Sequence, residues 1–165
     1  MPRLASVALP EPLRPVMEFL GTPSGRRIDA QLVRYTGHSP YSYLYGLDLG
    51  SSARYRPPLA LTTIGHRSGR LHTVALAYYD IDGAWAVVGS AGGSETEPHW
   101  VRNARANPAA WVHLNRRTTP VLAEVLDGEA KRPIWNRITE RVPLFDSFQA
   151  GVQRDIPIVV LRPRP

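Results

Sequence analysis

The chain has 165 residues, a formal net charge of +6 at pH 7, 43% apolar residues and no cysteine. This length predicts one domain with a buried core, and the lack of cysteine excludes disulfides, thiolate zinc sites and thiol nucleophiles. The prolines and charges of "MPRLASVALPEPLRP" argue against a signal peptide, and no apolar run reaches the roughly 20 residues of a membrane span. We therefore expect a cytoplasmic protein, and contact with a membrane surface stays open.

Arginine carries almost all of the positive charge, since Lys131 is the single lysine. This usage fits a GC-rich genome as well as any need for binding. A basic surface attracts nucleic acid, acidic membranes or phosphorylated ligands, and the planar guanidinium suits phosphate and carboxylate groups. Composition therefore favours an anionic partner without choosing among these classes.

The first third of the chain predicts little regular structure. Prolines and glycines in residues 1–25 predict an irregular arm with a short helical turn near 16–20, whereas apolar residues at helical intervals predict a helix over 26–36. Residues 37–58 predict a loop that carries a cluster of tyrosines, which are Tyr41, Tyr43, Tyr45 and Tyr55. We expect residues 1–56 to form an N-terminal arm and helix that pack on a barrel.

The remainder, 57–165, alternates short strands and helices and should complete one structural domain. The Asp-Gly pair at 82–83 is typical of a hairpin turn, and Pro98 suits the first position of a helix. The pattern predicts the α+β class, mainly β with flanking helices, as a split β-barrel of about six strands. The expected strands are 59–64, 71–79, 84–90, 109–114, 118–126 and 156–162, and the expected helices are 98–106, 129–142 and about 145–152.

Several common catalytic and binding motifs are absent. The sequence has no G-x-G-x-x-G after a strand, no G-x-x-x-x-G-K-[ST], no H-E-x-x-H and no G-x-S-x-G. His66 and His72 flank one turn but lack a third ligand, so we expect no metal site. The tryptophans occupy expected core or groove positions, so we expect no binding of nucleic acid.

Two stretches carry polar chemistry. The turn "GHRSGR" (65–70) has glycines that allow main-chain N–H groups to converge, and it adds the Ser68 hydroxyl and two guanidiniums. Taken alone, it is either a solvated hairpin or a grip for phosphate or carboxylate. The stretch "VVGSAGGSETEPHWVRNARANP" (87–108) leads from a strand through a glycine-rich loop into a helix, whose free N–H groups favour an anion. Together the two stretches favour an anion site.

Four motifs in order then resemble one family. They are T-T-x-G-x-x-S-G-x-x-x-T, V-V-x-S-x-G-G, P-x-W-x-x-N-x-x-A-N-P and I-P-I-V-V, spread over about 57–163. This order is similar to that of the deazaflavin-dependent nitroreductases, split-barrel proteins that use coenzyme F420. The resemblance implies an F420H2-dependent oxidoreductase that transfers a hydride to a flat electron-poor acceptor, such as a quinone, nitroaromatic or activated enone. Its partner would thus be a small molecule.

The resemblance also implies which residues bind the cofactor. The phosphate and acidic tail would meet the first turn, and the ring would lie in a groove beside the glycine-rich loop and the following helix. Carried over, the tail residues are His66, Arg67, Ser68 and His72; the groove residues are Thr73, Val74, Ala75, Leu76 and Ala77; the residues by the ring or phosphate are Val88, Gly89, Ser90 and Ala91; and those on the other side are His99, Trp100, Val101, Arg102 and Asn103.

This chain departs from the family pattern at two places. It has Ala91 where a lysine usually follows the serine of V-V-x-S, and it has Val142, Phe145 and Phe148 where some relatives carry tyrosines late in the chain. No catalytic side chain is assigned, so a nearby tyrosine or solvent would supply a proton. The candidates for the substrate pocket are Phe145, Phe148, Tyr43 and Tyr45. Two alternatives stay open: an F420 carrier or storage protein with little turnover, and an FMN-binding split-barrel protein. The oligomeric state is not predicted.

Overall fold

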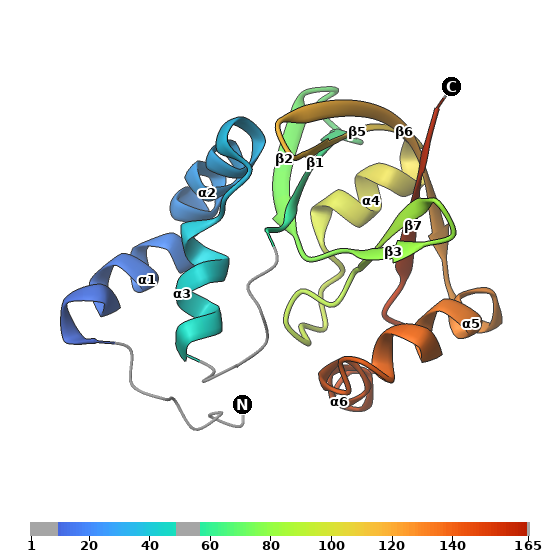
Figure 1. Cartoon of the computed structure of the whole chain (residues 1–165). Helices are drawn as coiled ribbons and strands as arrows, with labels where there is room; N and C mark the ends of the chain where they lie inside the picture. The colour runs from blue at the N-terminus through green and yellow to red at the C-terminus, as the bar shows by residue number, and fades with distance from the viewer. Residues whose placement is uncertain (1–9, 49–56, 165) are drawn as a thin grey trace. The chain divides into compact units, whose positions relative to one another are not determined.

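The computed structural model describes residues 10–48 and 57–164, without the side chains of 45–48 (Figure 1). Contact density divides the chain into two compact units. Unit 1 comprises Met1–Leu61, Thr73–Ala77 and His113–Arg117, and unit 2 comprises Thr62–His72, Tyr78–Val112 and Thr118–Pro165. The expected packing of residues 1–56 on the barrel stays a prediction.

Unit 1 contains the short 3-10 helix η1 (Glu11–Leu13) and helices α1 (Arg14–Gly21), α2 (Pro23–Thr36) and α3 (Pro40–Asp48). The irregular arm predicted for 1–25 is therefore wrong except for the helical turn near 16–20, which lies within α1, and the loop predicted for 37–58 is wrong where α3 forms. Pro15, Pro23 and Pro40 lie in the first turns of these helices, where a missing N–H costs no hydrogen bond. These prolines start helices, whereas the prolines of residues 1–25 were expected to keep that segment irregular.

A small apolar core and one buried carboxylate hold the three helices together. Leu20 of α1 and Leu44 of α3 are buried against each other, and Leu13, Met17 and Tyr41 pack around them. Asp29 of α2 is 3% exposed. It accepts hydrogen bonds from the Ser39 hydroxyl at 2.7 Å and the Tyr41 main-chain N–H at 3.0 Å, which fixes the start of α3 against α2.

Seven strands form one sheet in the order β2-β1-β5-β6-β7-β4-β3. With the helices, this half-barrel sheet confirms the α+β split-barrel class, although the strands number seven where about six were expected. The predicted strand 71–79 is in fact two, because the chain leaves the sheet at residues 77–78. The strands are β1 (Leu59–Ile64), β2 (Leu71–Leu76), β3 (Tyr79–Ile81), β4 (Ala84–Val88), β5 (Ala109–Leu114), β6 (Arg117–Leu126) and β7 (Ile158–Pro163).

The Asp-Gly hairpin predicted at 80–83 is confirmed. Ile81 faces Ala84 across antiparallel β3 and β4. Asp82 and Gly83 between them have φ values of 50° and 82°, which is the left-handed pair that a two-residue hairpin turn requires. The strand β4 then pairs with β7, with Ala86 opposite Val160, and this pairing places the end of β4 next to the start of β7.

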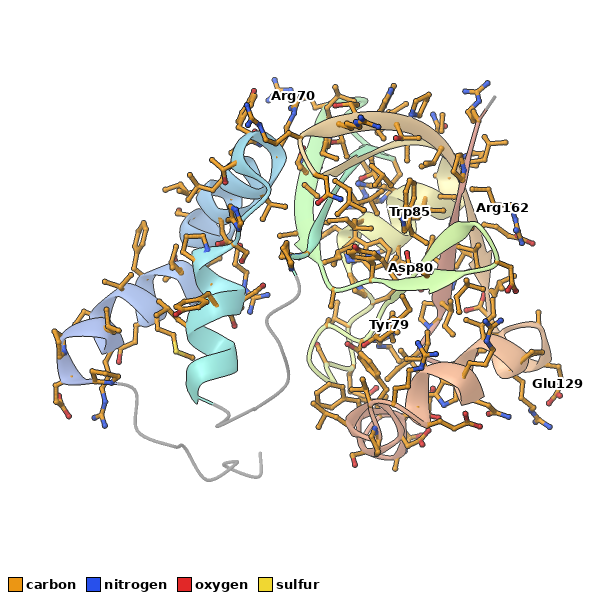
Figure 2. All side chains as sticks on the ribbon, in the orientation of Figure 1. Arg70, Tyr79, Asp80, Trp85, Glu129 and Arg162 are labelled. Atoms are coloured by element: carbon orange, nitrogen blue, oxygen red, sulfur yellow. The ribbon has the colours of Figure 1, made fainter. Side chains whose placement is uncertain are left out.

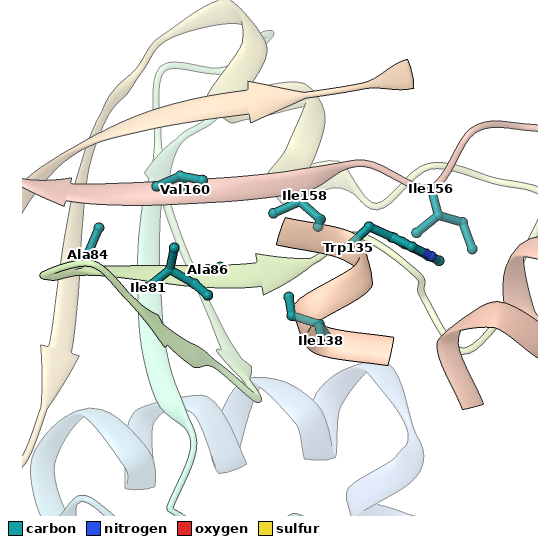
Figure 3. Close-up of a cluster of buried hydrophobic side chains, with 8 residues drawn as sticks. All are labelled: Ile81, Ala84, Ala86, Trp135, Ile138, Ile156, Ile158 and Val160. Carbon is teal, nitrogen blue, oxygen red and sulfur yellow. The ribbon is translucent and has the colours of Figure 1, made fainter. Parts of the chain in front are cut away.

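Unit 2 also contains α4 (His99–Ala106), α5 (Gly128–Thr139) and α6 (Leu144–Ala150). Helix α5 places Trp135 and Ile138 against β4 and β7, where they form a core with six other buried side chains (Figure 3). Each large apolar side chain buried in this way contributes about 1.5–3 kcal/mol. The cluster fixes both strand ends from which the glycine-rich loop and the segment before β7 extend. Its members are Ile81, Ala84, Ala86, Trp135, Ile138, Ile156, Ile158 and Val160.

Candidate functional site

The turn between β1 and β2 is closed by its own main chain. Gly65 donates to the carbonyl of Arg70 at 2.8 Å, and Gly69 donates to the carbonyl of Gly65 at 2.8 Å. A side chain at Gly65 would bring a Cβ within 2.7 Å of the Ser68 hydroxyl. A side chain at Gly65 would thus have to displace those of Ser68 and His72. The turn leaves residues 66–70 exposed (Figure 2, where Arg70 is labelled).

Asn103 of α4 ties this turn to the helix. Its side chain is 3% exposed, and its Oδ1 accepts from the main-chain N–H of His66 at 3.0 Å and from His66 Nδ1 at 2.9 Å. Its Nδ2 donates to the Thr63 hydroxyl at 3.1 Å. Because an amide oxygen only accepts, His66 carries a proton on Nδ1. Its Nε2 is then the ring nitrogen that can meet a ligand.

Helix α4 turns its apolar side chains inward. Trp100, Val101 and Ala104 are buried, and Ala104 was expected in the core. Pro98 precedes the helix as its N-cap residue with ψ 143°, one position earlier than predicted, because α4 begins at His99. Of the α4 residues predicted to bind the cofactor, exposed His99 and half-buried Arg102 have side chains that reach the surface.

The glycine-rich loop after β4 has a tight start. Gly89 is buried, and a Cβ there would lie 2.9 Å from Pro157 Cγ and 3.0 Å from Val101 Cγ2. The glycine thus lets β4 approach both β7 and α4. Ala91, Gly92 and Gly93 follow with φ values of 48°, 64° and 77°. Glycine adopts a positive φ at little cost, but Ala91 pays for its Cβ there, so the conformation of Ala91 needs support from its surroundings.

Arg154, which is not among the predicted site residues, provides that support. Its Nε donates to the carbonyl of Ser94 at 2.8 Å, and its Nη2 donates to the carbonyls of Gly89 and Ser90, each at 2.9 Å. The adjacent Gln153 N–H donates to Glu95 Oε1 at 2.9 Å. The available sequence signal was an arginine two residues before the I-P-I-V-V motif, with Asp155 between them.

Two guanidiniums at the loop are not fully satisfied. Arg102 Nη2 donates to the Glu97 carbonyl at 2.9 Å, but Arg102 Nε and Arg154 Nη1 are buried and have no hydrogen-bond partner among residues 10–48 and 57–164. The Glu97 carboxylate pairs with Arg105 at 3.0 Å. Hydrogen bonds from Arg105 to Asp127 and Glu97 raise the pKa of Arg105, although burial opposes this.

The site therefore has uncompensated positive charge. In the part of the chain that the structure describes, no carboxylate forms an ion pair with Arg67, Arg70, Arg102 or Arg154. The exposed side chains of Arg67 and Arg70 suit phosphate and carboxylate oxygens. The residues present thus fit a cofactor with a phosphate and an acidic tail.

The other predicted site residues differ in how far they are exposed. Thr73, Val74, Ala75 and Leu76 lie on β2 and are half-buried, while Ala77 follows it and is exposed. His72 is exposed, and its Nε2 lies 3.4 Å from the Ser68 hydroxyl. By contrast, Val88 is half-buried and Ser90 is buried, and Ala91 is exposed. Their contacts with a cofactor stay predictions.

The substrate-pocket candidates lie in both units. Phe145 and Phe148 of α6 pack edge to face with centroids 6.2 Å apart and cover the unit 2 core. Phe148 also contacts the loop, because a Cβ on Gly93 would lie 3.0 Å from its ring. Tyr43 of α3 is 51% exposed. The side chain of Tyr45 and all of Tyr55 lie outside the described residues.

Metal sites and membrane-spanning helices are two further features to consider. Across the described residues, no group of three or more histidine, aspartate or glutamate side chains could hold a metal ion. No helix within 10–48 or 57–164 has the length and apolar character to cross a membrane.

Comparison with known proteins places this chain in a family. The family described as F420H(2)-dependent quinone reductase matches residues 37–163. Rv3178 of Mycobacterium tuberculosis, named for F420H2-dependent quinone reductase activity, is 32% identical over 115 residues, or 68% of this chain and 97% of the relative.

Solved structures agree with this assignment. An F420-H2 dependent reductase called FDR-A is 31% identical, with a TM-score of 0.58 over 65% of this chain and 95% of that one. The heme storage protein HutZ from Vibrio cholerae shares the fold alone, at 16% identity and a TM-score of 0.51 over 68% of this chain and 84% of that one. The chain thus belongs to the F420H2-dependent quinone reductase family, and it is an F420H2-dependent reductase with coenzyme F420 as its cofactor.

Proposed function

We propose that the protein binds F420 with the phosphate and oligoglutamate tail at the 65–70 turn and the ring beside the glycine-rich loop, and reduces a flat electron-poor acceptor. A quinone is the first candidate, and nitroaromatics and activated enones are the others. One observation carries the proposal: Asn103 holds the turn and Arg154 holds the loop, while Arg67, Arg70 and Arg102 form no ion pair with a carboxylate of the described residues.

The reaction asks little of the side chains. When bound, the reduced deazaflavin supplies the hydride. The exposed His66, Arg67 and Ser68 hold anionic oxygens, and the Ser90–Ala91 main chain receives the flat ring. Holding both reactants in one geometry is the main contribution of the protein to the rate.

No proton donor follows from the candidates on α6, because Phe145 and Phe148 have no hydroxyl. Solvent or one of the tyrosines is then the source of the proton. Of the three functions that the sequence left open, family membership supports the reductase over an F420 carrier and over an FMN-binding protein. A cytoplasmic location and contact with a membrane surface stay predictions.

The test begins with parallel titrations of the purified protein with F420 and FMN. We expect F420 to bind more tightly, and more weakly as salt rises, since exposed charges are screened. Oxidation of F420H2, followed at 420 nm, is then compared for menadione, a nitroaromatic and an enone. Equal affinity for FMN, or no oxidation of F420H2 with any acceptor, contradicts the proposal.

A further inference from the structure

Arg154 holds both ends of the glycine-rich loop. It lies between α6 and β7 and is half-buried. Its guanidinium reaches the carbonyl of Ser94 at 2.8 Å on one side and those of Gly89 and Ser90 at 2.9 Å on the other. The planar fork of five N–H donors suits such divergent acceptors, whereas an ammonium is a compact point charge. The loop between Gly89 and Ser94 is therefore bridged by a single side chain.

The main chain that carries Arg154 is fixed in turn by Gln149 of α6. Gln149 Nε2 donates to the Arg154 carbonyl at 2.9 Å, and its Oε1 accepts from the Ile156 N–H at 2.9 Å. One amide side chain thus satisfies both sides of the segment. The position of Arg154 relative to α6 follows from these two bonds.

Lys131 of α5 completes this support. It is 7% exposed, and its Nζ donates to Gln149 at 3.1 Å, to the Ile156 carbonyl at 2.6 Å and to Asp155. Burial alone would raise the pKa of Asp155, but hydrogen bonds from the Gly128 N–H and from Lys131 outweigh it and lower that pKa. The carboxylate stays ionised, so the buried lysine keeps its partner.

The charge of Arg154 itself has no such partner. Its three acceptors are main-chain carbonyls, and the ion pairs of the described residues do not include it. Its Nη1 is buried without a hydrogen-bond partner. A ligand in solvent cannot reach this nitrogen while the loop keeps its conformation. Arg154 can therefore affect a ligand only indirectly, by holding the loop in place and by the electrostatic field of its positive charge.

We propose that Arg154 is a positioning residue for the cofactor. It holds loop 89–94, with its left-handed residues, in one conformation, and its positive charge favours the binding of an anion there. The inference rests on the proposed function, because it takes this loop as the place where the ring or phosphate binds. Within the run Ala91 to Gly93, the left-handed conformation of Ala91 is costly unless its surroundings hold it, whereas the two glycines adopt theirs freely. Arg154 is the side chain that bonds both ends of that run.

The first experiment needs no cofactor. Hydrogen exchange of the peptide spanning 89–96 is measured by mass spectrometry in the wild type, Arg154→Ala and Arg154→Lys. We expect at least tenfold faster exchange in both variants, since lysine cannot reproduce the fork, and unchanged exchange in β4 and β7. The matched control is Arg162→Ala, an exposed arginine of β7 that pairs with Glu124 at 3.2 Å (Figure 2). It should leave the loop unchanged.

The second experiment is an F420 titration of the same proteins. We expect both Arg154 variants to raise the Kd at least tenfold, and methylguanidinium to restore part of the affinity of Arg154→Ala. The proposal fails if loop exchange and Kd stay within twofold of wild type, or if affinity falls only together with global stability and without rescue. If the wild type does not bind F420, the proposed function fails, while the exchange of the loop still decides the role of Arg154. Arg154→Lys serves both measurements if Arg154→Ala does not fold.

Discussion

The Oδ1 of Asn103 accepts two hydrogen bonds from His66, one from its main-chain N–H at 3.0 Å and one from its ring Nδ1 at 2.9 Å. These residues are 37 positions apart in the sequence. Their contact joins the 65–70 turn to the helix after the glycine-rich loop. It also sets the tautomer of His66, because the oxygen has no proton to donate.

Asn103→Ala should therefore weaken both folding and binding. The substitution leaves the buried Thr63 hydroxyl and the His66 N–H without this partner, at a cost of about 1–3 kcal/mol for each group that stays unsatisfied. We expect a lower free energy of unfolding in urea and a weaker F420 complex. Nitrogen NMR of wild-type His66 should show the Nδ1-protonated ring.

The matched control is Asn107→Ala, at the end of the same helix. Asn107 Oδ1 accepts only a local bond from the Ala109 N–H at 3.0 Å, so this variant should lose some stability and keep its F420 affinity. If the two variants bind F420 equally well, Asn103 does not hold the turn for the cofactor.

Gly89→Ala tests the close approach of β4 to its neighbours. The added Cβ would lie 2.9 Å from Pro157 and 3.0 Å from Val101, and such overpacking costs about 1–3 kcal/mol. We expect the urea midpoint to fall, whether or not cofactor is present. Gly151→Ala is the control, because its nearest contact would be an ordinary 3.4 Å. Equal midpoints for the two variants would show that β4 can move away at little cost.

Stability should depend on pH through His113 of β5. The side chain is 4% exposed, and burial, aided by Arg34, lowers its pKa. Below about 6.5, the ordinary value for histidine, the unfolded chain takes up a proton that the folded histidine does not. The free energy of unfolding should thus fall as pH decreases from about 6.5 to the lower folded pKa, by at most about 1.4 kcal/mol per pH unit.

His113→Gln should remove this part of the pH dependence, which urea unfolding at several pH values between 5 and 8 can measure. His99→Gln, at an exposed position, should keep it. An unchanged slope in His113→Gln would mean that other groups cause the effect.

Elements with clear local signals could be predicted from the sequence. Contacts between residues far apart in the chain, and hydrogen bonds to main-chain carbonyls, could not. The 65–70 turn and the 98–106 helix were placed to within one residue, because glycine, proline and apolar spacing are local signals. Helix α3 was missed, and α1 was expected only as a short turn near 16–20, since proline both ends and starts helices. Arg154 was missed because its acceptors are carbonyls, which every residue has, and Gly89 lies 65 positions away from it.

Gly89 shows the same limit in another way. Its place in the V-V-x-S-x-G-G motif suggested contact with a cofactor, whereas its missing side chain makes room for Pro157 and Val101. A glycine in a sequence marks either a positive φ, as at Gly83, or a close approach, as at Gly89, and only the fold shows which of the two applies.

Arg67→Ala tests where the acidic tail binds. Arg67 is exposed and has no ion pair among the described residues, so its guanidinium is available to a phosphate or glutamate carboxylate. A charge-assisted hydrogen bond of this kind contributes about 1.5–3 kcal/mol, so the Kd for F420 should rise about ten- to a hundredfold. A deazaflavin fragment without the tail should bind almost as before, since it has nothing for this arginine to hold. Arg137→Ala, which removes an exposed arginine paired with Asp82 at 3.1 Å, should change neither Kd. If both ligands weaken equally in Arg67→Ala, the arginine supports the ring site or the local fold, and the tail binds elsewhere.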